Sequence, residues 1–214
     1  KGGKNTILAC YVYDNKANGI LIDRYVHSNG TTVIDNAAGS AVKNCLVGRN
    51  SSGAYIGNNW NGIFVRYSNN VTVENSIIVS NGRTANNLAK ISGVRYQELT
   101  GGTISGNFIG TDATTNTSLG NAFDGITLHT KANNIVISGN TIGFNGSTSS
   151  YGNGGGIALR GASNNNTIQS NNIGRLASLA DVGNYDYGIS VEGSSGNTIG
   201  GNSASLGNFI GNSK

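Results

Sequence analysis

Residues 134–160 have the sequence NIVISGNTIGFNGSTSSYGNGGGIALR, and variants of this unit recur along nearly the whole 214-residue chain. The unit begins with alternating apolar residues at Ile135 and Ile137, followed by Asn140 and an Ile-Gly step. A variable polar loop comes next, and the unit ends in Gly-Ile-x-Leu at residues 156–159. Because alternation of apolar and polar residues is typical of a β-strand with one buried face, each unit is expected to contribute short strands.

Two positions within the unit, one Asn and one Gly, recur along the chain with the same period. The Asn marker falls at Asn44, Asn75, Asn107, Asn140 and Asn171, with spacings of 31, 32, 33 and 31 residues. The Gly marker falls at Gly62, Gly93, Gly125, Gly156 and Gly188, with spacings of 31, 32, 31 and 32 residues. Such a period, with turn residues and no helical pattern, is typical of a solenoid in which each coil places its strands on those of the previous coil.

We therefore predict an all-β fold, a right-handed single-stranded parallel β-helix of six or seven coils with a period of about 31 residues. The helix is expected to form one domain over residues 1–214. Residues 25–39 interrupt the period and are expected to form an insertion or a small additional strand. Because the chain begins and ends within the repeat, we expect it to be an excerpt or mature part of a longer solenoid.

The composition excludes several classes of protein. With 34 glycines, no proline and 11% charged residues, the chain does not resemble a helical globule, while its regularly placed Ile, Val and Leu argue against disorder. The net charge of +4 arises without any run of like charge, which disfavours nucleic acid as a partner. No apolar stretch approaches the ~18 residues of a membrane-spanning helix, so no transmembrane segment is expected.

Four motifs carry a resemblance to known proteins: NFIGTDA at residues 107–113, LGNAFDGI at 119–126, NTIGG at 197–201 and GNFIG at 207–211. They resemble the repeats of right-handed parallel β-helix proteins of the pectate-lyase-like superfamily, and more narrowly the repeat arrays of large secreted or surface bacterial proteins. The resemblance covers almost the whole chain and implies an extracellular or cell-surface location. The superfamily includes lyases, hydrolases, epimerases, phage tailspikes, adhesins and filament components, so the resemblance does not select a function.

The repeated polar residues are expected to be structural. The five Asn of the first marker are predicted to stack into a ladder at a turn, and the repeated Gly to mark positions with no room for a Cβ atom. A ligand site built from these Asn is the less favoured alternative. Cys10 takes the ladder position in the first coil, whereas Cys45 follows Asn44 and is expected to point the other way, which favours a free thiol over a disulfide.

Non-repeated residues are expected on the outer face of the Gly-Ile strands, where they form two adjacent exposed columns. The residues two positions after each Gly are Leu21, Phe64, Arg95, Thr127, Ala158 and Ser190. The residues four positions after each Gly are Asp23, Arg66, Gln97, His129, Arg160 and Glu192. The columns therefore place cations in the middle of the face and acidic residues at its ends.

A candidate catalytic group lies in these columns. In a lyase or epimerase that acts on uronic-acid polymers, a cation offsets the substrate carboxylate while a base removes the proton alpha to it. His129 beside Arg95 and Arg160 fits that chemistry. The alternative is a solvated strand face whose charges pair between coils.

A candidate carbohydrate-binding surface consists of Trp60, Phe64, Arg66, Tyr67 and Tyr96. Sugar rings stack on exposed aromatic side chains, and Trp60 lies in an Asn-rich loop that could present it. The alternative is that these rings fill an enlarged end of the solenoid or a subunit interface.

No metal or cofactor is predicted. The two histidines, His27 and His129, and the two cysteines lie at spacings that do not form a metal-binding cluster. Calcium would need converging oxygen ligands, which the scattered aspartates and the missing nonapeptide repeat do not indicate. The motif set of polygalacturonase-like hydrolases is also missing.

Two functions therefore remain. The favoured one is an extracellular structural or adhesive solenoid that presents loops and a strand face to polysaccharide, or associates end to end with other copies of itself as a filament or surface-layer component. The alternative is a polysaccharide lyase or epimerase acting on uronic-acid polymers. The sequence leaves catalysis open and favours the non-catalytic role.

Overall fold

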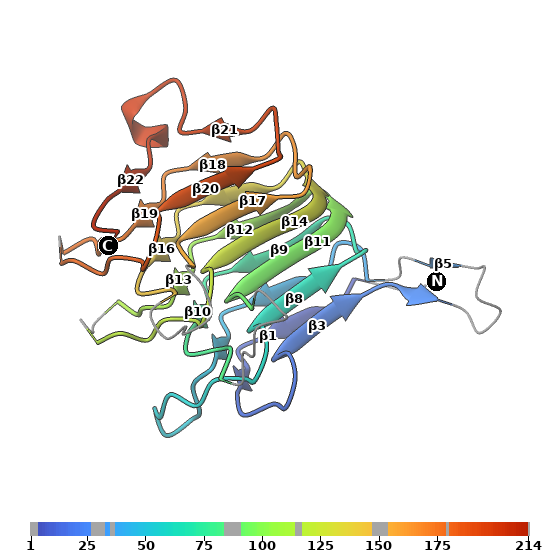
Figure 1. The fold of residues 1–214 in the computed structure, drawn as a ribbon. Coiled ribbons are helices and arrows are strands. Elements are labelled where there is room, and N and C mark those ends of the chain that lie inside the picture. Colours follow the sequence, from blue (N-terminus) through green and yellow to red (C-terminus); the bar gives the residue numbers. More distant parts are fainter. Residues whose placement is uncertain are drawn as a thin grey trace.

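The computed structural model describes residues 4–26, 33–34, 37–83, 91–113, 117–146, 154–178 and 180–213. The chain winds through three parallel β-sheets that enclose one hydrophobic core (Figure 1). This confirms the predicted all-β parallel solenoid. Among the described residues, no helix is long and apolar enough to cross a membrane.

Successive coils contribute one short strand to each sheet in turn. The first sheet contains β1 (Thr6–Leu8), β6 (Ala41–Lys43), β9 (Val71–Glu74), β12 (Gly102–Ser105), β15 (Val136–Ser138), β18 (Thr167–Gln169) and β21 (Thr198–Ile199). The second contains β2 (Tyr11–Val12), β7 (Leu46–Val47), β10 (Ile77–Ile78), β13 (Phe108–Ile109), β16 (Thr141–Ile142), β19 (Asn172–Ile173) and β22 (Phe209–Ile210). The third contains β3 (Ile20–Asp23), β8 (Ile63–Arg66), β11 (Val94–Thr100), β14 (Ile126–Asn133), β17 (Ile157–Arg160) and β20 (Ile189–Glu192).

The predicted interruption after the first coil contains an antiparallel pair, β4 (Tyr25–Val26) and β5 (Val33–Ile34). A single 3₁₀ turn, η1 (Ala204–Leu206), lies in the last described coil. Figure 1 shows the strands of the third sheet side by side from β3 to β20, in the order of the coils.

The repeated Gly lies where coils approach most closely, immediately before each strand of the third sheet. A Cβ atom on Gly93 would lie 2.7 Å from Nδ2 of Asn121 and 2.9 Å from the backbone oxygen of Gly125. These contacts are too short for a side chain, which explains why Gly recurs once per coil.

The core follows the alternation of the sequence. On β8, Ile63 and Val65 are fully buried, whereas Phe64 and Arg66 are half-buried on the outer face. Burial of each such aliphatic side chain stabilises the fold by about 1.5–3 kcal/mol. The inward column is thus the main source of stability, and the outward column is available for other contacts.

The asparagine ladder is present, but its register differs from the prediction in two coils. Nδ2 of Asn107 donates to Oδ1 of Asn140 (2.9 Å), and Asn140 donates in the same way to Asn171 (2.9 Å). Asn44 and Asn75 do not belong to this ladder and were predicted wrongly. They lie one residue earlier, with φ of 53° and 51°, because Asn tolerates the left-handed conformation that this turn requires.

The residues that do hold the ladder position in those coils are Cys45 and Ser76, with Cys10 below them. The prediction that Cys45 points away from Cys10 was therefore wrong. Both are free thiols, Cys45 is fully buried, and burial raises the pKa of Cys45.

A second ladder lies where the chain leaves the second sheet, in the loops that were predicted to be variable. It consists of Asn15, Asn58, Asn81, Asn121, Asn145 and Asn184, joined by side-chain hydrogen bonds of 2.7 to 3.0 Å. Two Asn ladders therefore stabilise the two turns that flank the second sheet.

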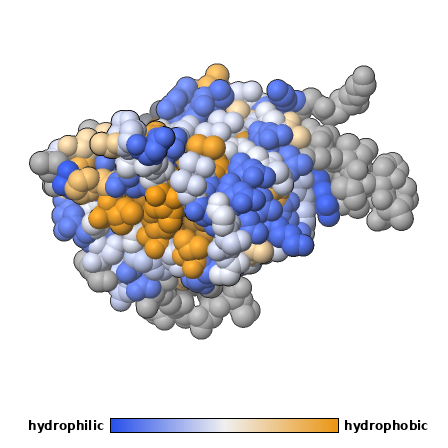
Figure 2. Space-filling view, turned by 90° about the horizontal axis from the view of Figure 1, so that it is seen from above, coloured by the Kyte–Doolittle hydropathy of each residue, from blue (hydrophilic) through white to orange (hydrophobic). Residues whose placement is uncertain are grey.

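Apolar side chains are exposed on the last described coil. Val191, Ile199, Phe209 and Ile210 are each between 43% and 49% exposed. Figure 2 views the molecule from this end and shows apolar side chains gathered near its centre. End-to-end association through such a surface remains a prediction.

Candidate functional site

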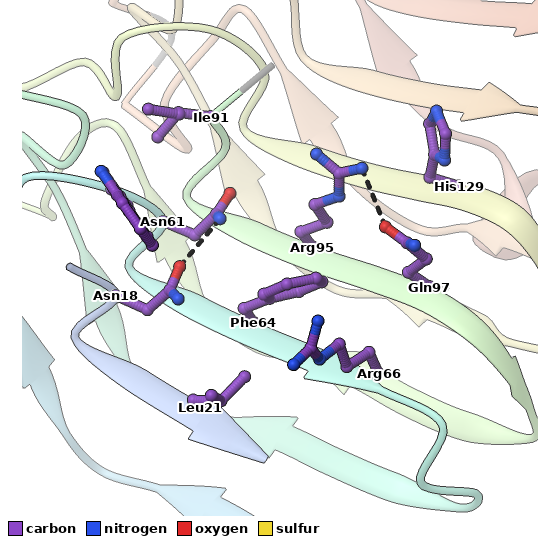
Figure 3. A pocket seen from close by; sticks show the side chains of 10 residues that line it. Asn18, Leu21, Asn61, Phe64, Arg66, Ile91, Arg95, Gln97 and His129 are labelled. Carbon is purple, nitrogen blue, oxygen red and sulfur yellow. Dashed lines mark hydrogen bonds between the residues drawn. The ribbon is translucent and has the colours of Figure 1, made fainter. Parts of the chain in front are cut away.

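A groove of about 560 Å³ crosses the outer face of the third sheet over its first four coils (Figure 3). It combines aromatic, amide and cationic side chains. The lining residues are Asn18, Leu21, Trp60, Asn61, Phe64, Arg66, Ile91, Arg95, Gln97 and His129. Five of the residues predicted from the sequence are thus brought together: Trp60, Phe64, Arg66, Arg95 and His129.

The register of the third sheet builds this groove. Phe64 pairs with Leu21 on one side and with Arg95 on the other. In the neighbouring column, Gln97 pairs with Arg66 and with His129. Both predicted columns are therefore confirmed in their order, with neighbouring residues of a column about 4.8 Å apart, as adjacent strands are.

The apolar part of the groove is formed by Trp60, Leu21 and Phe64. Trp60 is 49% exposed and Leu21 is 51% exposed. The loop that carries Trp60 is held in place by Asn61, whose Nδ2 donates to Oδ1 of Asn18 (2.9 Å) and whose Oδ1 accepts from the backbone N–H of Ser92 (2.8 Å). The ring is therefore presented to solvent by a hydrogen-bonded loop.

Arg95 is the more deeply placed cation. Its Nη2 donates to Oε1 of Gln97 (2.9 Å), and its guanidinium carbon lies 5.5 Å from the centre of the Phe64 ring. Burial lowers the pKa of Arg95, whereas the nearby charge of Asp124 raises it and that of Arg160 lowers it. An arginine remains protonated despite such shifts, so Arg95 supplies a positive charge inside the groove.

The second cation, Arg66, lies at the rim. Its Nε lies 2.7 Å from Oδ2 of Asp23, and its guanidinium carbon is 5.7 Å from the centre of the Phe64 ring. The half-buried His129 contacts the hydroxyl of Thr130 through Nδ1. In Figure 3 its ring lies on the same side of the sheet as Arg95 and Gln97.

Arg160 lies outside the groove, in a buried cluster. Its Nη1 is 2.6 Å from Oδ2 of Asp124, its Nη2 donates to the Tyr187 hydroxyl (2.6 Å), and its Nε is 3.2 Å from Oε2 of Glu192. Burial alone lowers the pKa of Arg160, but the charge and hydrogen bond of Asp124 outweigh burial and raise it. Arg160 therefore has a structural position and does not face the groove.

The same cluster corrects the prediction that both columns are exposed along their whole length. Thr127 and Ala158 are fully buried and Arg160 is only 6% exposed. The Tyr187 hydroxyl donates to Oδ1 of Asp124 (2.6 Å) and accepts from Arg160 (2.6 Å), so side chains of three coils pack together at this part of the face. Alternation gives the direction of a side chain, but it does not show which loop covers it.

The structure separates the remaining aromatic candidates from the groove. Tyr96 is fully buried, and its hydroxyl donates to the backbone oxygen of Val71 (2.9 Å), so it cannot contact a ligand on this surface. It follows Arg95 directly, and alternation places it inward. Tyr67 lies beyond the end of β8 and lines a different pocket.

Sequence reasoning did not select Asn18, Asn61 and Gln97 as site residues. Gln97 stands in a predicted column, so its position was available from the spacing. Asn18 and Asn61 each lie directly before the Gly of their coil, outside the columns that the spacing predicted. Within the described part of the chain, no group of three or more His, Cys, Asp or Glu side chains could hold a metal ion.

Comparisons with known proteins add the following. No family model and no curated protein matches the sequence. Among solved structures, the A-module of the mannuronan C-5 epimerase AlgE4 from Azotobacter vinelandii is similar, with a TM-score of 0.53 and 17% sequence identity over 97% of this chain. The chain spans 58% of the length of that structure. At this identity the likeness shows the parallel β-helix fold alone.

Proposed function

We propose that this chain is an extracellular solenoid that binds an acidic polysaccharide in the groove of the third sheet. The observation that carries the proposal is the meeting of Trp60 and Phe64 with Arg95, Arg66 and His129 in one open groove. Adhesion of the solenoid to a polysaccharide matrix follows from such binding.

The chemistry of the groove suits this class of ligand. The C–H faces of a sugar ring pack on exposed aromatic side chains such as Trp60. A carboxylate on the sugar accepts charge-assisted hydrogen bonds from a guanidinium, and Arg95 lies in the adjacent coil to Phe64. The amides of Asn61 and Gln97 supply donors and acceptors for hydroxyl groups.

The similar structure supports the same class of ligand. The name of that protein is a mannuronan epimerase, so its β-helix is associated with an acidic polysaccharide. That association also supports the extracellular location, because such polymers lie outside cells.

A second candidate is a lyase or epimerase reaction in the same groove, which the position of His129 near Arg95 favours. A neutral imidazole would take the proton alpha to the sugar carboxylate, while Arg95 would offset the negative charge that develops. A lyase must then protonate the departing glycosidic oxygen, and an epimerase must return a proton from the other ring face. Apart from His129, the described residues that line the groove include no Asp, Glu, Tyr, Cys or Lys side chain for that second proton transfer, so binding has the stronger support.

Calorimetry with a polyuronate hexamer and a neutral hexamer of the same linkage tests the binding proposal. Arg95→Gln should weaken binding of the acidic hexamer by about tenfold, as loss of a hydrogen bond to a charged group does. Lys43→Gln is the charge-matched control, since Lys43 pairs with Glu74 on the first sheet. Equal affinity for both hexamers, or no saturable binding of either, would overturn the proposal.

The catalytic candidate is tested with His129→Asn. If the wild-type chain releases unsaturated uronides or exchanges the C5 proton for deuterium, this variant should lose turnover while it keeps its affinity for the hexamer. Binding without turnover in the wild-type chain would exclude the catalytic candidate.

A further inference from the structure

A second pocket, of about 390 Å³, lies where β8, β11 and β14 run into the turn toward the first sheet. We call it the corner pocket. The side chains that give it chemical character are Arg24, Tyr67, Glu98 and Lys131.

Left-handed backbone places three of these side chains outward. Tyr67, Glu98 and Lys131 have φ of 56°, 53° and 60°, which interrupts the alternation of the strand. Tyr67 follows the outward-facing Arg66 and would point inward in a regular strand, yet it is half-buried on the surface while the next residue, Ser68, is fully buried. Non-Gly residues seldom adopt this conformation, so the turn is held by its surroundings.

The corner pocket continues the groove. Gln97 lines the groove and the next residue, Glu98, lines the corner pocket. Arg66 connects the two pockets directly, because its guanidinium carbon lies 5.7 Å from the centre of the Phe64 ring and 5.9 Å from the centre of the Tyr67 ring.

The charge of the corner pocket favours an anion. The guanidinium of Arg24 stacks on the Tyr67 ring, 3.9 Å from its centre, and its buried Nε has no hydrogen-bond partner among the described residues. Lys131 is exposed, and the one acid, Glu98, accepts a hydrogen bond from Gln97 (3.2 Å). Two cations against one carboxylate leave the pocket positive.

The groove does not continue toward the C-terminal coils. Along the solenoid axis beyond Arg95, the next outward residues are Thr127 and Ala158, both fully buried. A chain longer than the groove therefore cannot continue over those coils. Between Phe64 and Tyr67 the strand advances ~10 Å, about the length of two sugar rings.

We infer that the corner pocket is a second anion-binding subsite for the same glycan, which crosses the third sheet along its strands from Trp60 toward Lys131. The inference rests on the proposed polysaccharide binding. In this arrangement Arg24 and Lys131 bind acidic groups of sugar units that only a longer oligomer places in the corner pocket.

Affinity as a function of ligand length tests this subsite. With polyuronate dimers and hexamers as probes, Lys131→Gln should weaken binding of the hexamer about fivefold, ~1 kcal/mol, and leave the affinity for the dimer unchanged. Arg24→Gln should act in the same way. Arg95→Gln should lower the affinity for both the dimer and the hexamer, and Lys43→Gln should change neither affinity. Lys131 is exposed, so its variant is expected to fold, and thermal unfolding checks each variant.

The outcomes separate the two proposals. If Arg95→Gln weakens binding of the hexamer while Lys131→Gln and Arg24→Gln do not, the proposed subsite is wrong and the proposed polysaccharide binding stands. If no acidic oligomer binds the wild-type chain, both are wrong. Weakening of the dimer by Lys131→Gln would contradict the assigned path.

Discussion

Asp124 is the most heavily bonded side chain near the groove. Its Oδ1 accepts from Gly155 N (3.0 Å) and the Tyr187 hydroxyl (2.6 Å), and its Oδ2 accepts from Thr127 Oγ1 (2.7 Å) and Arg160 Nη1 (2.6 Å). This carboxylate therefore connects the coil of β14 to the next two coils.

Asp124→Asn should lower the free energy of unfolding by about 3–5 kcal/mol, because it leaves the buried Arg160 without its main counter-charge. Urea denaturation measures the change. Arg160→Met should cost a similar amount, and the double variant should cost clearly less than the sum of the two. Additive costs would show that the two side chains do not act as a pair.

The buried tyrosines affect how the stability of the fold responds to alkaline pH. Burial raises the pKa of Tyr96, and burial together with Asp124 raises the pKa of Tyr187. The unfolded chain loses these protons near pH ~10 while the folded chain keeps them, so stability is full below that pH and falls as pH rises through it.

The loss of stability between about pH 8 and ~10.5 should be smaller in Tyr187→Phe than in the wild-type chain. Tyr13→Phe is the control, since Tyr13 is 40% exposed. Urea midpoints at both pH values give the comparison. The same pH response in Tyr187→Phe and the wild-type chain would contradict the effect assigned to Tyr187.

At the scale of elements, the second Asn ladder carries a prediction of its own. Asn121 donates to Ile78 O (3.1 Å) and to Asn145 Oδ1 (2.9 Å), and its own Oδ1 accepts from the amide of Asn81 (2.9 Å). Asn121→Ala removes these bonds and leaves buried polar groups without partners.

We expect Asn121→Ala to lower the free energy of unfolding by about 3 kcal/mol, at the upper end of the cost of unsatisfied buried groups. Asn202→Ala, at an exposed position, should change it by less than ~0.5 kcal/mol. Chemical denaturation of the two variants tests this contrast. Equal effects would mean that the second ladder contributes nothing measurable.

The repeat predicted the elements well because strand stacking imposes a fixed number of residues between equivalent positions. The columns through Arg95 and His129 follow from that spacing alone. The second ladder was not predicted because its members are separated by 43, 23, 40, 24 and 39 residues, as the variable loops fall between them. No fixed period reveals such a set.

The candidate site was predictable in part for the same reason. Phe64, Arg66 and Arg95 face the groove because alternation points them outward. Arg160 also points outward, but its guanidinium is hydrogen-bonded by Asp124 and Tyr187 of the neighbouring coils and is only 6% exposed, which sequence spacing does not report. Exposure therefore depends on which side chains of neighbouring coils pack together, and the period does not contain that information.

At the scale of the whole molecule, the groove is part of a continuous stack. The third sheet joins six strands, and its groove-facing residues from Leu21 to His129 pair in register, so their side chains are held on hydrogen-bonded backbone. We therefore expect ligand binding to change side-chain rotamers in the groove and to leave the backbone largely unmoved.

The most direct test of groove binding uses the single tryptophan of the chain, Trp60, which lines the groove and is 49% exposed. Titration with a polyuronate hexamer should shift Trp60 emission and protect it from acrylamide quenching, with the same saturation curve as the calorimetric binding isotherm. A hexamer that binds by calorimetry while Trp60 emission and quenching stay unchanged would contradict the groove as the binding site.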